Sequence, residues 1–392
     1  MKASNIDIYT KSGFPYGLAP ENFVRQMALG LKSNEQNVKV VICKGQPTNS
    51  RQNDTNIPSS FLFFKSTSKN EITKALELFG FFFMIPFSIL KRKITNKTNI
   101  IILYGIDYFY LIFPIWVLTR TLNIKLIRIA TDIYHKKTVA SVWWKWPKWY
   151  FYKLQSNWFD TKLDGIVCVS SYLYNHYLEQ KAEIKKLIII PHFIDLESFA
   201  TTHQTENNSI NTRIGFCGTA LLANGIIELI DATLRIVKNN KDFELLMIGE
   251  IPENLKDQIE KMILNHESHF VFVGRKTNNE IPSLLNSCDI LINPRRSGVF
   301  AEAGFPTKLG EYFATSKPIV ATAVGDLKHY FDNGNQLILV NPDSSEAIVE
   351  GITLLLKDPM QAKIIGKNGF NWAKENLDYK NNAKKLITFL DQ

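Results

Sequence analysis

Short apolar segments alternate with longer amphipathic ones along the chain, and this alternation limits the possible folds more than any other feature. The first cycle begins with an apolar segment at Ile6–Tyr9, continues through a glycine-bearing loop to a helical pattern at Phe23–Leu31, and ends with an apolar segment at Val38–Cys43. The same order recurs in the second half, up to about residue 340. Strands and helices that alternate in this way form parallel sheets with helices on both faces. The sequence therefore predicts an α/β fold with doubly wound sheets.

A polar segment near the middle of the chain separates the two alternating halves. It covers Ala200–Ser209, has no apolar side chain after Ala200, and is where we expect the hinge. The predicted boundaries are residues 1–198 for an N-terminal domain and residues 199–375 for a C-terminal domain, followed by a helix within residues 376–392. A chain of 392 residues is long enough to give each domain its own core.

Charge is distributed unevenly between these halves. The formal net charge is +9; residues 1–198 hold 26 Lys and Arg against 14 Asp and Glu, whereas the remainder holds 20 against 23. A basic half attracts anionic membrane surfaces and nucleic acids. Because no helix-turn-helix, zinc-finger or RNP motif accompanies the charge, we expect no nucleic-acid partner.

The four cysteines are Cys43, Cys168, Cys217 and Cys288, and each lies in or beside an apolar segment. No pair has the spacing of a metal or redox motif. We therefore expect buried thiols, and neither a metal site nor a cofactor. The N-terminus is too polar for a signal peptide, which favours a cytoplasmic location.

Two aromatic segments of the first half each allow more than one interpretation. Leu76–Leu90 is apolar apart from Glu77 and Ser88, is too short to span a bilayer, and precedes Lys91, Arg92 and Lys93. It predicts either a buried core helix or a helix that dips into an anionic membrane surface. Residues 142–159 are rich in Trp and Tyr, which stack on sugars, lie at membrane interfaces or simply pack.

The segment Phe305–Thr322 has the most specific pattern. Pro306 suits the first turn of a helix, residues 307–314 predict that helix, and a strand is expected at residues 319–322. Lys308 and Glu311 lie about one turn apart on one helix face, and a helix N-terminus attracts anions. This combination suits a phosphate and a sugar diol. The alternative is an ordinary helix N-terminus with a surface Lys–Glu pair.

The pattern Pro-x-Lys-x-x-Glu-Tyr-x-Ala-x-x-x-Pro-Ile-Val, which begins at Pro306, resembles the nucleotide-sugar site of the retaining family 4 glycosyltransferases. The resemblance implies the GT-B fold, in which two Rossmann-like domains face each other across a cleft and a C-terminal helix crosses back to the first domain. It also implies that Glu311 binds the ribose and that the preceding loop binds the diphosphate and sugar. The donor-binding residues implied or proposed are Gly218, Thr219, Asn224, Arg275, Lys276, Thr277, Arg295, Arg296, Phe305, Pro306, Thr307, Lys308 and Glu311.

The chain departs from the family pattern at three positions. The family has Arg and Lys in the first loop of this half, where Thr219 and Asn224 stand here. A diphosphate leaving group requires positive charge or hydrogen-bond donors, so we expect Arg295, Arg296 and Lys308 to replace them. Glu302 lies one place before the position of the family's first glutamate, and its catalytic role is correspondingly open.

The first half supplies further candidates. Asp132 and His135 follow a predicted strand at Lys125–Ala130, and residues at such strand ends line the ligand crevice, so both are catalytic candidates beside Glu302. The loop that contains Gly13, Tyr16 and Gly17 resembles the family's acceptor loop; a plain strand-to-helix turn is the alternative. It is no dinucleotide fingerprint, because its glycines are four apart and no suitable acidic residue follows the second strand.

Together these features predict a metal-independent glycosyltransferase, and the family resemblance implies that the anomeric configuration is retained. It would move a sugar from a nucleoside diphosphate sugar to a glycan or lipid-linked acceptor at the inner face of the plasma membrane, in bacterial surface polysaccharide synthesis. One alternative is a nucleotide-sugar 2-epimerase of the same fold. Another, suggested by the missing first-loop Arg and Lys, is an inactive protein that binds a sugar nucleotide or a glycan.

Overall fold

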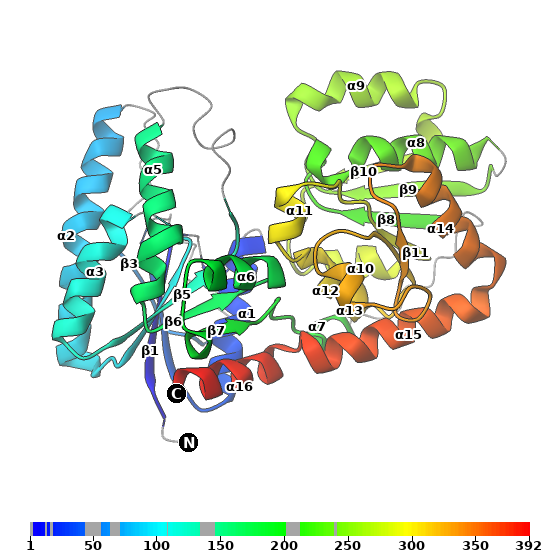
Figure 1. Cartoon of the computed structure of the whole chain (residues 1–392). Coiled ribbons are helices and arrows are strands. Elements are labelled where there is room, and N and C mark those ends of the chain that lie inside the picture. Colours follow the sequence, from blue (N-terminus) through cyan, green and yellow to red (C-terminus); the bar gives the residue numbers. More distant parts are fainter. Residues whose placement is uncertain are drawn as a thin grey trace. The chain divides into compact units, whose positions relative to one another are not determined.

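The computed structural model describes residues 3–11, 14–15, 19–43, 56–62, 71–107, 109–133, 146–200, 212–238 and 241–392. The chain forms two compact units (Figure 1). Unit 1 consists of Met1–Phe193 and Tyr379–Gln392, and unit 2 of Ile194–Asp378. Each unit has one parallel sheet with helices on both faces, which confirms the predicted α/β fold.

The sheet of unit 1 has seven strands in the order β3-β2-β1-β4-β5-β6-β7. In its centre, Ile6 pairs with Val38 on one side and with Ile100 on the other. Most strand residues are buried, as expected for a parallel sheet covered on both faces. The strands are β1 (Asn5–Thr10), β2 (Asn37–Ile42), β3 (Ser59–Phe61), β4 (Ile100–Tyr104), β5 (Lys125–Ala130), β6 (Gly165–Cys168) and β7 (Leu187–Ile189).

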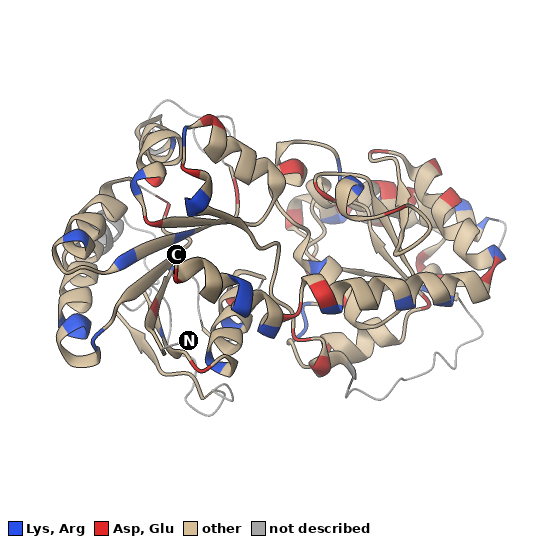
Figure 2. Cartoon of the chain, turned by 60° about the horizontal axis from the view of Figure 1, so that its bottom comes forward, with Lys and Arg blue, Asp and Glu red and all other residues tan. Residues whose placement is uncertain are grey.

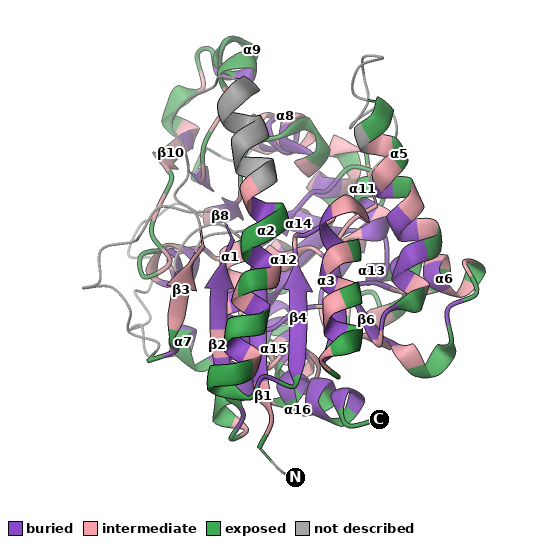
Figure 3. Ribbon diagram, turned by 90° about the vertical axis from the view of Figure 1, so that its left-hand side faces the viewer, coloured by how far each residue is buried: buried purple, intermediate pink, exposed green. Residues whose placement is uncertain are grey.

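Two apolar cores lie on the two faces of this sheet. One core joins the sheet to α1 (Ala19–Ser33), α6 (Ser171–Glu179) and α16 (Tyr379–Leu390). The other joins it to α2 (Glu71–Asn96) and α3 (Phe109–Thr121), which lie in front of the strands in Figure 3. Next to α3 lie α5 (Trp146–Leu154) and a π-helical turn, η3 (Gln155–Phe159).

Helix α2 extends beyond its predicted end at Leu90. Its inner face buries Phe81, Ile85 and Ile89. Arg92, which we predicted to belong to a basic flank, is instead buried and forms an ion pair with Asp7 of β1. A buried carboxylate requires such a partner, and the pair fixes the end of α2 to the sheet. No helix in the described part of the chain is long and apolar enough to cross a membrane.

The sheet of unit 2 has six strands in the order β10-β9-β8-β11-β12-β13. They are β8 (Thr212–Cys217), β9 (Phe243–Ile248), β10 (Phe270–Gly274), β11 (Ile290–Asn293), β12 (Ile319–Thr322) and β13 (Ile338–Val340). The helices are α7 (Glu197–Ala200), α8 (Ile226–Val237), α9 (Glu253–Ile263), α10 (Ile281–Asn286), α11 (Val299–Ala303), α12 (Thr307–Ala314), α13 (Leu327–Tyr330), α14 (Ser345–Lys357) and α15 (Pro359–Asn376). Both α12 and β12 have the bounds predicted from the sequence.

The chain passes between the units earlier than we predicted. Ile194, Leu196 and Phe199 are buried in the core of unit 2, so the boundary lies between Phe193 and Ile194. The hinge predicted at residues 200–209 comes after this boundary in the sequence, and residues 201–211 lie outside the described part of the chain. Helix α16 belongs to unit 1, where it packs against α1 and where the side-chain amide of Asn382 donates a hydrogen bond to the carbonyl oxygen of His192.

Candidate functional site

The candidate site of unit 2 lies where its parallel strands end. The carboxyl ends of β8, β9, β11 and β12 meet at one edge of the sheet, where ligands bind in folds of this class. Main-chain contacts connect the loops that follow them. The N–H of Ala220 donates to the carbonyl of Glu250 at 2.9 Å, and the N–H of Arg296 donates to that of Ala223 at 3.1 Å. Loops that are far apart in sequence therefore form one connected surface.

Two glycines permit this close approach. A Cβ atom at Gly249, whose φ is 147°, would lie 2.0 Å from the carbonyl oxygen of Gly218. A Cβ atom at Gly225, whose φ is 69°, would lie 1.7 Å from the carbonyl oxygen of Pro294. Only glycine adopts these conformations at such distances. The loop after β8 is thus held between the ends of β9 and β11.

Within that loop, the predicted donor residues form hydrogen bonds to main-chain carbonyl oxygens. The N–H of Gly218 donates to the carbonyl of Ile248 at 2.8 Å. The side-chain amide of Asn224 donates to the carbonyl of Thr219, also at 2.8 Å, and closes the loop. The first loop of unit 2 therefore has neutral side chains at the two positions where the family resemblance places cations.

Lys308 and Glu311 form the centre of the site. Both belong to α12, and the Lys308 ammonium lies 3.0 and 3.2 Å from the two carboxylate oxygens of Glu311, which is buried. Burial alone would lower the pKa of Lys308, but Glu311 and the Cys217 sulfur outweigh it and raise the pKa. The predicted cation and carboxylate thus lie together on one helix face, at the end of the sheet where the strands terminate.

Tyr312 connects α12 to the end of β8. Its phenolic oxygen accepts a hydrogen bond of 2.7 Å from the backbone N–H of Cys217, and the ring is fully buried. Burial raises the pKa of the Cys217 thiol to about 11, although the nearby Lys308 acts in the opposite direction. From the sequence alone, Tyr312 is expected only on the apolar side of this helix. A buried tyrosine hydroxyl requires a hydrogen-bond partner, so a tyrosine on the buried face of a predicted helix was the sequence signal for this bond.

Arg295 holds the segment that leads into α12. Its guanidinium donates hydrogen bonds of 3.1 Å to the carbonyl oxygens of Gly304 and Phe300, and lies 4.5 Å from the centre of the Phe300 ring. The side chain therefore anchors α11 and the loop of Phe305 and Pro306. Phe305 is buried. Pro306 is the N-cap residue of α12, and no side-chain hydrogen bond caps this helix N-terminus.

The other predicted cations lie near carboxylates. Arg296 is about half exposed and lies 3.0 Å from Asp343 and 3.3 Å from Glu228. At the end of β10, Lys276 lies 3.5 Å from Glu280, which also accepts hydrogen bonds from Thr277. Arg275 is exposed beside them. Their roles toward a donor remain predictions.

Glu302 contacts the loop after β12. Its carboxylate accepts a hydrogen bond of 3.2 Å from the N–H of Gly325 and lies 3.9 Å from Lys328. Glu302 belongs to α11, a helix of five residues that was not predicted from the sequence. The carboxylate thus connects α11 with the segment between β12 and α13, and its catalytic role remains a prediction.

Only one of the candidate site residues of unit 1 lies in the described part of the chain. Asp132 follows β5 as expected, is half-buried, and its carbonyl oxygen accepts a hydrogen bond of 3.3 Å from the Tyr152 hydroxyl. His135, Gly13, Tyr16 and Gly17 lie outside the described residues.

Unit 1 contains a buried ionic cluster that was not predicted from the sequence. Arg128 of β5 forms ion pairs with Asp160 and, at 2.8 Å, with Asp107, and donates a hydrogen bond of 2.7 Å to the Tyr177 hydroxyl. Burial would lower the pKa of Arg128, but Asp160 and its other neighbours raise it well above its usual value. An arginine inside an otherwise apolar strand was the sequence signal. The cluster positions Asp107 just beyond the end of β4.

The cysteines agree with the prediction, since all four are buried and free. Within the described ranges, no group of three or more His, Cys, Asp or Glu side chains could hold a metal ion.

Comparison with known proteins shows which proteins unit 2 and the whole fold are similar to. Residues 200–372 match the family model described as glycosyl transferases group 1. An uncharacterized glycosyltransferase of Methanocaldococcus jannaschii, MJ1178, is 29% identical over 228 residues, which are 58% of each chain. The putative teichuronic acid biosynthesis glycosyltransferase TuaC of Bacillus subtilis is 25% identical over 226 residues, or 54% of this chain and 53% of its own. The matched segments thus span little more than half the length of these relatives.

Solved structures match over a longer range. The crystal structure of Anabaena HepE in complex with UDP and glucose superposes with a TM-score of 0.73, covers 99% of this chain and 100% of HepE, and is 14% identical. At that identity the likeness concerns the fold alone. The protein therefore has the GT-B fold, and residues 200–372 of its second unit resemble the glycosyl transferases group 1.

Proposed function

We propose that the protein is a glycosyltransferase that moves a sugar from a nucleoside diphosphate sugar to an acceptor bound by unit 1. One observation carries the proposal: Glu311, buried and paired with Lys308, lies on α12 at the edge where β8 and β11 end. A carboxylate at this place can accept hydrogen bonds from two ribose hydroxyls. HepE, which shares the fold, was solved with UDP and glucose, and this supports a nucleoside diphosphate sugar as the donor.

The diphosphate would bind between the Gly218 loop and the start of α12. The first N–H groups of a helix have no acceptor within the helix, and with the helix dipole they favour an anion. Lys308 adds positive charge in the same place. Because Arg296 lies between two carboxylates and Arg295 is bound to carbonyl oxygens, we assign the larger part of the stabilisation of the leaving diphosphate to α12 and Lys308.

Retention of configuration and independence from a metal complete the proposal. Both follow from the resemblance to family 4 enzymes. In this scheme the leaving phosphate assists deprotonation of the acceptor, so that no enzyme nucleophile is needed. The N–H groups and Lys308 would carry out the charge stabilisation that a metal performs elsewhere.

The acceptor that fits the chain best is a glycan or a lipid-linked glycan, met at the cytoplasmic face of a bacterial plasma membrane. The name of TuaC refers to teichuronic acid, a surface polysaccharide, and this supports a place in such a synthesis. The basic first half of the chain supports contact with an anionic membrane.

Calorimetry with UDP, GDP, ADP and TDP tests the donor assignment. We expect one of them to bind, and Glu311→Gln to weaken that binding roughly 10- to 100-fold, which corresponds to the loss of hydrogen bonds to a charged group. Glu253→Gln, on the exposed side of α9, is the matched control and should bind as the parent protein does. Binding to none of these nucleotides would exclude the proposal.

Product analysis separates the remaining possibilities. With the matching sugar nucleotide, a transferase forms a larger product only when an acceptor is present. A 2-epimerase changes the sugar nucleotide without an acceptor, and an inactive binding protein leaves it intact. Mass spectrometry of reactions with and without a lipid-linked acceptor distinguishes these three results. Addition of EDTA should leave the rate unchanged.

A further inference from the structure

We propose that the outer face of α2, together with exposed residues of α3, α5 and η3, binds flat on an anionic lipid bilayer. The proposal rests on the proposed function only for the nature of the acceptor; the surface itself is independent of the donor site in unit 2. It assigns a partner to the aromatic helix whose interpretation the sequence left open.

The first observation is an apolar stripe along α2, formed by Phe83, Phe87, Leu90 and Ile94. These residues follow one another at intervals of four, three and four, so they share one helix face. Phe87 is 68% exposed and Ile94 is 73% exposed, while Phe83 and Leu90 are 55% and 41% exposed. The opposite face is packed on the sheet. A row of large apolar side chains on the exposed face of a helix indicates a surface that binds another protein or a membrane.

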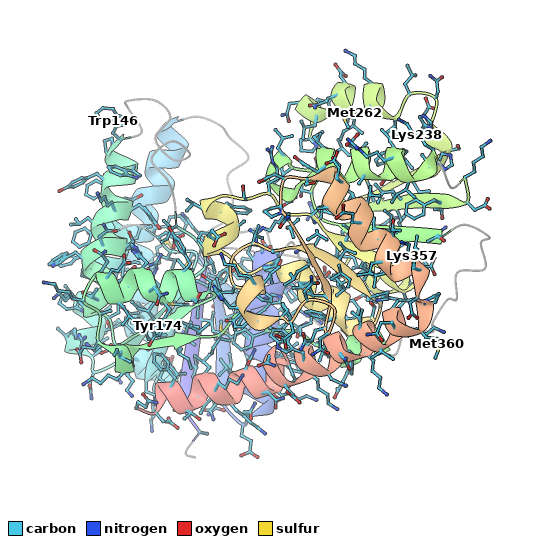
Figure 4. The ribbon with its side chains drawn as sticks, turned by 45° about the vertical axis from the view of Figure 1, so that its right-hand side comes forward. Trp146, Tyr174, Lys238, Met262, Lys357 and Met360 are labelled. Carbon is cyan, nitrogen blue, oxygen red and sulfur yellow. The ribbon has the colours of Figure 1, made fainter. Side chains whose placement is uncertain are left out.

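The neighbouring helices extend this stripe into a face. Helix α3 contacts α2 on one side and α5 on the other, as Figures 1 and 3 also show. Phe113 and Val117 of α3 are exposed, as are Tyr150 of α5 and Trp158 of η3. Trp146, also exposed, lies at the outer end of α5 (Figure 4). Tryptophan and tyrosine favour the interface between lipid and water.

The charge of this face favours an anionic partner. Residues 80–96, 109–121 and 146–158 include no Asp or Glu, but six Lys and Arg. Among these, Lys91 and Lys153 are exposed, whereas Arg92 is buried against Asp7. Figure 2 shows the charged residues of both units. Cations beside exposed apolar side chains are attracted to a negatively charged bilayer surface.

The geometry indicates binding in the plane of the membrane. Phe81, Ile85 and Ile89 attach the inner face of α2 to the sheet, so only the outer side chains can enter the lipid. A helix in this position inserts its apolar side chains to the depth of the headgroups. A second copy of the chain is a less suitable occupant, because lysines of both copies would then face each other. The experiments described below distinguish such a dimer from binding to a bilayer.

Vesicle flotation tests the proposal with the full chain. We expect the protein to float with vesicles of phosphatidylcholine and phosphatidylglycerol, and to float much less with phosphatidylcholine alone or in high salt. The triple variant Phe83→Ser, Phe87→Ser, Ile94→Ser should lose at least tenfold in vesicle binding. The matched control is Leu354→Ser, Met360→Ser, Ile364→Ser, three exposed apolar residues of α14 and α15 in unit 2, which should float like the parent protein. Met360 is labelled in Figure 4.

A second variant tests the charge separately from the apolar side chains. Lys91→Glu combined with Lys153→Glu should weaken binding to the anionic vesicles, while Lys363→Glu combined with Lys367→Glu, on α15, should not. Nucleotide calorimetry on each variant shows that it is folded and separates this proposal from that of the donor site. Three results would overturn the proposal: no flotation of the parent protein, equal flotation of the stripe variant, or a parent protein whose mass by light scattering is that of a dimer and falls to a monomer in the stripe variant.

Discussion

The backbone N–H of Cys217 donates a hydrogen bond of 2.7 Å to the phenolic oxygen of Tyr312, and this bond ties the end of β8 to α12. Cys217 precedes Gly218, where we expect the diphosphate loop to begin, and Tyr312 follows Glu311, to which we assign the ribose. Because both residues are buried, the bond fixes the spacing between these two parts of the proposed donor site.

Replacing this tyrosine tests its role in positioning the donor. Tyr312→Phe keeps the ring but leaves the buried N–H of Cys217 without its acceptor, which costs roughly 1–3 kcal/mol. We expect the free energy of unfolding in urea to fall by that amount, and the dissociation constant for the nucleotide to rise several-fold. Tyr150→Phe, on an exposed ring of α5, should change neither value. If Tyr312→Phe lost stability but bound the nucleotide unchanged, the bond would be structural only.

Lys308 gives a prediction for pH dependence. Burial would lower its pKa, but Glu311 and Cys217 raise it above the usual 10.5. A group with a raised pKa in the folded state adds stability that is complete below its unfolded pKa and is lost as the pH rises through the folded value. The stability difference between the parent protein and Lys308→Met should therefore be constant from about pH 6 to 9 and decrease only above about pH 10.5.

Urea denaturation at a series of pH values measures this difference. Lys276→Met removes a more loosely paired lysine at the end of β10 and should cost less than about 1 kcal/mol at every pH. A Lys308 contribution that already falls between about pH 7 and 9 would show that the ammonium deprotonates in that range, contrary to the raised pKa.

The segment around α12 was predictable because the residues that set its boundaries lie within the segment itself. Pro306 can only precede or open a helix, and Pro318 separates α12 from the buried run of β12. The spacing of Lys308 and Glu311 then fixes their common face without any knowledge of the remaining chain. The ion pair between them follows from helix geometry alone.

Other features depend on contacts that a local pattern does not contain. The basic run after Leu90 looked like one flank, but the buried carboxylate of Asp7, 85 positions away, draws Arg92 inward. The polar segment at residues 200–209 looked like a hinge, although Phe199 just before it is already buried in unit 2. Helix α11 has only five residues, and its position depends on the guanidinium of Arg295.

The buried cluster in unit 1 predicts a large effect on stability. Arg128→Met would leave the buried carboxyl group of Asp160 without its main partner, and removing one member of such a pair costs roughly 3–5 kcal/mol. Arg120→Met is the matched control. Its guanidinium is about half exposed and lies 3.1 Å from Asp164, so its loss should cost less than about 1 kcal/mol. Equal urea midpoints for the two variants would show that unit 1 does not depend on the cluster.

Gly225 and Gly274 form a matched pair that isolates the close approach of two loops at the candidate site. Their φ angles, 69° and 66°, are nearly equal, so alanine at either position bears a similar left-handed strain of about 1–2 kcal/mol. A Cβ atom at Gly274 meets nothing within 4 Å, whereas one at Gly225 would lie 1.7 Å from the carbonyl oxygen of Pro294.

Gly274→Ala should therefore lower the free energy of unfolding by the strain alone. Gly225→Ala should lower it further and also weaken nucleotide binding, because the loop after β8 must move away from the end of β11. Urea denaturation and calorimetry on both variants measure the two effects. If the two variants were equally stable, the loops could separate at no cost. The arrangement of Gly218 relative to α12 would then depend on the Cys217–Tyr312 bond and not on the approach at Pro294.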